Sequence, residues 1–339
     1  MVELYRTKLI SDGLNIYQLD SYPRSHSIYG FVFNYIVLGI CNLFDLQISI
    51  FAQRIIVGIF IICSSLIVMS IIYIKIKSLI LSILGFLLMY ATSMNGDMVG
   101  AYPNAAGVFF FLTSIYIPFR NNYNNQSLLF SLFFSILSFF TKLYFVLGLF
   151  YVLTYTFLYI SKKRAIIFSI LSTLIFLFIL VIVNWIYPNY LNATIFPLGH
   201  DNFNFNYLHL IKQTIHYSVL NYGLVVILIM YIVEKLSSSY NIFSKYLIKR
   251  IIEFDYLKIR ISFNEYCLFL SVIIVTAKLG GNVGAYLSYY LQLLSPFLII
   301  SALTIASTKR YLKTIIITIL GLINVVYINS RFIEIDIKD

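Results

Sequence analysis

The apolar stretch Ser127–Ile160 constrains the fold of this chain more than any other segment. It holds 34 residues and a single charged side chain, Lys142. One helix of that length would run roughly 50 Å at about 1.5 Å per residue, whereas the hydrocarbon core of a bilayer is only ~30 Å thick. We therefore expect two slightly short membrane spans with Lys142 at the turn between them.

The charge on Lys142 has two interpretations. A charge inside a membrane segment is costly, so such a residue is a functional candidate. Alternatively, the side chain snorkels to the interface and only marks the end of a span.

Composition identifies a polytopic membrane protein. The chain is 60% hydrophobic and 11% charged, whereas a soluble domain carries about 25% charged residues. The net charge of +11 does not indicate a nucleic-acid partner, because the basic residues lie between apolar runs, as topology signals do. The sequence contains no P-loop, which argues against an ATP-driven pump.

Apolar runs predict an all-α bundle of about ten membrane spans with one additional interfacial helix. We expect residues 1–50 to form an external N-terminal loop with that helix, residues 51–328 the transmembrane helical domain, and residues 329–339 a tail. The predicted spans are 51–73, 78–93, 105–118, 127–141, 143–160, 165–186, 217–233, 265–277, 287–307 and 314–328.

Basic residues orient these spans. More than half of the 24 Lys and Arg residues follow the spans on one side, which is therefore expected to be cytoplasmic. The opposite side receives the loops 94–104, 187–216 and 278–286, together with Lys142. Residues 28–44 either span the membrane or lie in its outer interface, and this choice decides whether residues 1–27 are cytoplasmic or external.

Polar side chains on the predicted outer face are the candidate site. Lys and Arg bind phosphate, and a carboxylate can take a proton from a hydroxyl group. This chemistry suits a phosphate-bearing lipid, whose head group lies at the same depth. The candidates are the carboxylates Glu3 and Asp97 as catalytic proton acceptors, Arg24, Lys142 and Lys278 as phosphate ligands, and His26, Asn104, His200, Asp201, Asn282 and Tyr286 as substrate ligands. Asp97 is also a candidate ligand for a divalent cation, Mg²⁺ or Mn²⁺; no other cofactor is indicated.

Several motifs follow one another in a suggestive order. They are ELY (3–5), SDGLNIYQLD (11–20), SYPRSHSIYG (21–30), AYPNAAGVFFFL (101–112), FFTKLYFVL (139–147) and KLGGNVGAYLSYYLQLLSPFLI (278–299). In this order the chain resembles the GT-C superfamily of polytopic glycosyltransferases, particularly the bacterial protein-mannosyltransferase and aminoarabinose-transferase families.

The resemblance implies that residues 1–27 are external and that residues 28–44 form an interfacial helix. It also implies that the first membrane span of the family would precede Met1. It implies Glu3 as the catalytic base and Arg24 and Lys142 as contacts of the carrier phosphate. Asn104 stands where an aspartate is common in the family, with Asp97 as a substitute.

The expected function is transfer of a sugar from a polyprenyl-phosphate donor to a cell-envelope glycan or lipid-linked acceptor. The enzyme would be a multi-pass protein of the cell (plasma or inner) membrane, surrounded by membrane lipids. Two alternatives are a polysaccharide polymerase of the O-antigen or capsule type and a non-catalytic flippase or transporter of lipid-linked saccharides.

Overall fold

The computed structural model describes residues 2–18, 27, 29–97, 102–195, 206–221, 225, 226, 229, 262–281 and 289–306. Within these ranges the chain is helical and contains no strand, which confirms the all-α class. The helices are α1 (Val2–Ser11), α2 (Val32–Leu43), α3 (Ile50–Ile76), α4 (Leu79–Asp97), α5 (Asn104–Arg120), α6 (Asn125–Phe139), η1 (Leu143–Val146), α7 (Leu147–Tyr155), η2 (Thr156–Ile160), α8 (Lys162–Ile186), α9 (Tyr190–Thr194), α10 (Tyr207–Leu220), α12 (Phe263–Ile274), η4 (Val275–Leu279), η5 (Tyr290–Leu294) and α13 (Ser295–Ala306).

Among the described residues, three helices are long and apolar enough to cross a membrane. They are Ile50–Ile76, Leu143–Ile160 and Lys162–Ile186. Other apolar helices occupy predicted span positions but are shorter, among them Leu79–Met94, Asn125–Phe139, Phe263–Ala277 and Tyr290–Thr304. The predicted span 314–328 lies outside the described residues. The chain is therefore a helical membrane protein, and the count of about ten spans stays a prediction.

Local capping sets where several helices begin. The Ser49 hydroxyl accepts a hydrogen bond from the Ala52 N–H (3.2 Å) at the start of α3. The Asn124 side chain accepts one from the Ser127 N–H (2.8 Å) at the start of α6. These side chains satisfy N–H groups that the first helical turn leaves without intrahelical partners.

The predicted turn at Lys142 is present. Helix α6 ends at Phe139 and η1 begins at Leu143. The Lys142 N–H donates to the Ser138 carbonyl (2.9 Å), and the Lys142 carbonyl accepts from the Phe145 N–H (3.1 Å). The chain therefore reverses within a few residues, and Lys142 is fixed at the end of the bundle.

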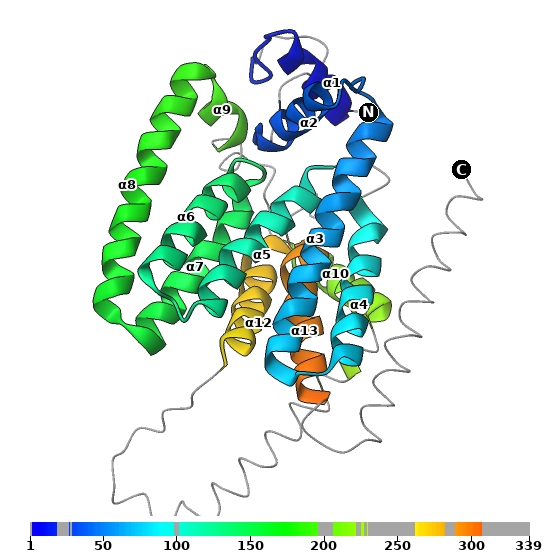
Figure 1. Ribbon diagram of the computed structural model, residues 1–339, viewed down its shortest axis with the longest axis vertical. Helices are drawn as coiled ribbons and strands as arrows, with labels where there is room; N and C mark the ends of the chain where they lie inside the picture. Colours follow the sequence, from blue (N-terminus) through cyan, green and yellow to red (C-terminus); the bar gives the residue numbers. More distant parts are fainter. Residues whose placement is uncertain are drawn as a thin grey trace, which may run out of the picture.

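Figure 1 shows α3 to α7, α12 and α13 alongside one another, with α8 along one edge. Helices α1, α2 and α9 lie at one end, with α9 beside the end of α8 and with α1 and α2 beside the beginning of α3. Helix α2 has 12 residues, about 18 Å of helix, which is too short to cross a ~30 Å hydrocarbon core by itself.

Two predicted loops contain helices instead. Residues 2–11 form α1, and the segment 187–216 contains α9 and the first ten residues of α10. Both regions were expected to be loops because they are polar. Tertiary packing explains the difference. Tyr190 of α9 is buried against the N-terminal segment, and the hydroxyls of Tyr217 in α10 and of Ser295 share a hydrogen bond (2.9 Å).

Candidate functional site

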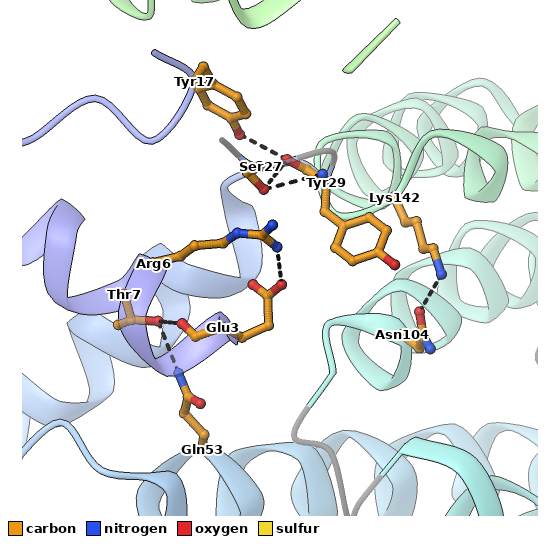
Figure 2. Close-up of polar contacts among 9 residues, drawn as sticks. All are labelled: Glu3, Arg6, Thr7, Tyr17, Ser27, Tyr29, Gln53, Asn104 and Lys142. Carbon is orange, nitrogen blue, oxygen red and sulfur yellow. Dashed lines mark hydrogen bonds and ion pairs between the residues drawn. The ribbon is translucent and has the colours of Figure 1, made fainter. Parts of the chain in front are cut away.

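Lys142 and Asn104 meet at the end of the bundle that carries α1 and α2. The Lys142 Nζ donates a hydrogen bond to the Asn104 Oδ1 (2.8 Å). Asn104 is the first residue of α5 and is only 7% exposed, and Lys142 is half-buried. Two of the predicted site residues are therefore in direct contact (Figure 2).

Three tyrosine rings surround the Lys142 ammonium. The Nζ lies 4.8 Å from the ring centre of Tyr29, 5.1 Å from that of Tyr144 and 5.8 Å from that of Tyr289. We call these three residues the tyrosine cage. Their negatively polarised faces attract the cation.

Tyr29 is held in place through its backbone. Its carbonyl accepts hydrogen bonds from the Tyr17 hydroxyl and from the Ser27 hydroxyl, both at 3.0 Å. The next residue, Gly30, donates its N–H to the Thr141 carbonyl (3.3 Å). A Cβ atom on Gly30 would overlap the Phe140 carbonyl, so only glycine permits this close approach.

Tyr144 and Tyr289 form the other wall of the cage. Their ring centres are 4.9 Å apart at an interplanar angle of 64°. The Tyr144 hydroxyl donates to the Gln292 Oε1, and Gln292 belongs to η5, a π-helical turn that begins directly after Tyr289. Such turns are frequent at functional sites.

Helix α1 brings a buried ion pair to the same region. The Arg6 guanidinium donates to the Glu3 carboxylate, and the two residues are 6% and 4% exposed. The Arg6 Cζ lies 5.9 Å from the Tyr29 ring centre. The predicted base Glu3 is thus a buried, ion-paired side chain on a helix and not a residue of a solvated loop.

A hydrogen bond between buried side chains fixes α1 on α3. The Gln53 Nε2 donates to the Thr7 Oγ1 (3.0 Å), and both residues are fully buried. The Thr7 hydroxyl also donates to the Glu3 carbonyl (2.9 Å). The position of the Glu3–Arg6 pair therefore depends on the docking of α1.

Electrostatics keep the Tyr29 hydroxyl neutral. Burial, and next the neighbouring Glu3 carboxylate, raise the pKa of Tyr29 to about 12, and the Arg6 guanidinium acts in the opposite direction. A phenol is already protonated at neutral pH, and this shift moves its deprotonation further above the physiological range, so the hydroxyl can donate a hydrogen bond.

The described part of the chain contains only some of the predicted site residues. Glu3, Asn104 and Lys142 gather around Tyr29. Asp97 ends α4 and Lys278 lies in η4, but their side chains lie outside the described residues. Arg24, His26, His200, Asp201, Asn282 and Tyr286 also lie outside them.

Among the described residues, no group of three or more His, Cys, Asp or Glu side chains could hold a metal ion. The gathered groups are instead an ammonium, a guanidinium, a carboxylate, an amide and phenols. Such a set is suited to binding an oxyanion and to moving one proton near it.

Sequence reasoning missed Arg6, Tyr29, Tyr144 and Tyr289. The chain contains 29 tyrosines, so a tyrosine alone is no signal. The spacing of Glu3 and Arg6 would have indicated a pair if residues 2–11 had been taken as a helix.

Comparisons with known proteins identify no relative: no family model matches the chain, and no curated protein or solved structure is significantly similar to it.

Proposed function

We propose that this protein is a multi-pass glycosyltransferase of the cell membrane, of the GT-C type. It would transfer a sugar from a polyprenyl-phosphate donor to a cell-envelope glycan or a lipid-linked acceptor. The reaction would take place at the end of the bundle that carries Lys142, with α2 lying in the outer membrane interface.

The position of the Lys142 ammonium carries this proposal. It is held by Asn104 at 2.8 Å and by the tyrosine cage, at a helix end. A phosphate at the depth of lipid head groups could reach a cation in this position. An ammonium has three N–H donors and a full positive charge, and both suit contact with a phosphate oxygen.

In the proposed reaction, one bond forms as another breaks, and residues of this chain receive the proton and stabilise the leaving group. The acceptor hydroxyl oxygen attacks the anomeric carbon, and the bond between that carbon and the phosphate oxygen breaks. The electron pair leaves with the phosphate, whose charge the Lys142 ammonium stabilises. The hydroxyl proton passes to a carboxylate, Glu3 or Asp97. Arg6 would orient the Glu3 carboxylate for this step.

The test uses membranes that contain the full chain and a radiolabelled polyprenyl-phosphate sugar. We expect release of polyprenyl phosphate together with a sugar product. The Lys142→Ala variant should abolish transfer and keep its membrane insertion. Lys163→Ala is the matched control, because Lys163 is exposed in the first turn of α8, away from Asn104 and Tyr29.

Three outcomes contradict the proposal. Unchanged transfer in Lys142→Ala would remove the phosphate role of this residue. Movement of the lipid across the membrane without cleavage would indicate a flippase. Extension of an existing polysaccharide from a diphosphate-linked repeat, with no use of the monophosphate donor, would indicate a polymerase.

A further inference from the structure

We propose that Tyr29 binds the phosphate directly, with its hydroxyl donating a hydrogen bond to the anion that Lys142 holds. This inference rests on the proposed function for the identity of the donor lipid. The chemistry it requires is a phosphate oxygen as acceptor, whether on a lipid or free.

The position of Tyr29 is the first argument. Its ring lies between the two cationic side chains of the site, 4.8 Å from the Lys142 Nζ and 5.9 Å from the Arg6 Cζ. Figure 2 shows its hydroxyl on the side of the ring that faces Lys142 and Asn104. An anion that contacts the ammonium there would lie within reach of the phenol.

The rigidity of the residue is the second argument. Hydrogen bonds from Tyr17 and Ser27 hold the Tyr29 carbonyl at 3.0 Å each, and the next residue is bonded to the Thr141 carbonyl. The turn that carries Lys142 and the segment that carries Tyr29 are thus joined. A binding group whose supporting contacts are fixed in advance loses little entropy when the ligand arrives.

The third argument is chemical. An anion needs donors, and a phenol is a donor only while it is protonated. The Tyr29 phenol is protonated across the physiological range, and burial, followed by the Glu3 carboxylate, raises its pKa further, to about 12. A neutral donor beside a cation provides a directed hydrogen bond to phosphate without adding a second charge.

The test compares Tyr29→Phe with the wild type in detergent-solubilised full-length protein. The probes are a short-chain polyprenyl phosphate and inorganic phosphate, with calorimetric binding and sugar transfer as readouts. Tyr29→Phe keeps the ring over Lys142 and removes only the hydroxyl. We expect about tenfold weaker binding of polyprenyl phosphate, as is typical for loss of one hydrogen bond to a charged group, with an unchanged melting temperature. Tyr5→Phe is the matched control, because Tyr5 is exposed on α1.

The outcomes separate this inference from the proposed function. If the wild type transfers sugar and Tyr29→Phe binds polyprenyl phosphate equally well, the inference is wrong and the function stands. If the wild type binds inorganic phosphate through Tyr29 but neither binds the lipid nor transfers sugar, the phosphate site is supported and the glycosyltransferase proposal is wrong. If neither probe binds the wild type, both are wrong.

Discussion

The Lys142 ammonium lies 2.8 Å from the Asn104 amide oxygen, although 38 residues separate the two along the chain. This contact joins the start of α5 to the turn between α6 and η1. The amide oxygen accepts one hydrogen bond of the ammonium and has no formal charge itself. The Asn104 side chain thereby affects how strongly the site attracts an anion.

Asn104→Asp should weaken anion binding. The new carboxylate would bear a negative charge beside the ammonium and compete with a phosphate for it. We expect at least about a tenfold loss of affinity for polyprenyl phosphate, measured calorimetrically, since a partly buried charge pair contributes more than ~1 kcal/mol. Asn121→Asp makes the same change at the exposed opposite end of α5 and should have no effect. Equal affinities of the two variants would disprove the charge argument.

Gly30→Ala should displace Tyr29 from the site. The added Cβ would overlap the Phe140 carbonyl, so the bond between the Gly30 N–H and the Thr141 carbonyl (3.3 Å) must break. We expect sugar transfer to fall by at least about tenfold, the cost of one lost hydrogen bond to a charged group, with the chain still inserted. Gly39→Ala in α2 is the control, because its Cβ would meet no atom within 4 Å and alanine favours a helix. Normal transfer by Gly30→Ala would show that this close approach does not matter.

The Glu3–Arg6 pair should show strong energetic coupling. Removing one partner leaves the other charge buried, which typically costs about 3 kcal/mol or more, whereas removing both avoids that penalty. We therefore expect Glu3→Ala and Arg6→Ala each to lower the free energy of unfolding in detergent. The double variant should lose clearly less than the sum of the two losses. Additive losses would indicate that the two side chains act independently.

Stability should depend on Tyr29 at alkaline pH. The folded-state pKa of about 12 lies above the ordinary tyrosine value of 10.0, so folding favours the protonated phenol. This contribution is fully present below pH 10 and is lost as the pH rises toward 12, with a total on the order of 2–3 kcal/mol. The melting temperature of the wild type should therefore fall relative to that of Tyr29→Phe over this interval. A constant difference between the two proteins across these pH values would contradict the raised pKa.

Cysteine labelling on intact cells should reveal the orientation of the chain. Asp12 is exposed just after α1, and Lys163 is exposed in the first turn of α8. With the N-terminal segment external, a membrane-impermeant maleimide should label Asp12→Cys directly and Lys163→Cys only after permeabilisation. The wild type, in which Cys41 and Cys267 are buried and Cys63 is partly exposed, gives the background. The reverse labelling pattern would place residues 1–27 in the cytoplasm.

Local sequence determined the helices and one turn of this protein. The length of the apolar run Ser127–Ile160 and its single charge predicted the reversal at Lys142, because a membrane limits how long one helix can be. Apolar composition likewise predicted helices at the positions of α3 to α8, where each backbone group finds a partner inside its own helix. The polar segments were harder to predict. Helices α1 and α9 and the first ten residues of α10 were expected as loops, because packing stabilises them and their own composition does not.

Only the tertiary structure decided the composition of the site. The sequence provided Lys142, Asn104 and Glu3 as candidates but gave no sign that Tyr29, Tyr144 and Tyr289 enclose the ammonium. It also did not show that Arg6 pairs with Glu3, or that Gly30 must lie against the Phe140 carbonyl. These are contacts between segments far apart in the chain or inside an unexpected helix. They depend on how helices pack in three dimensions, and local composition does not predict that arrangement.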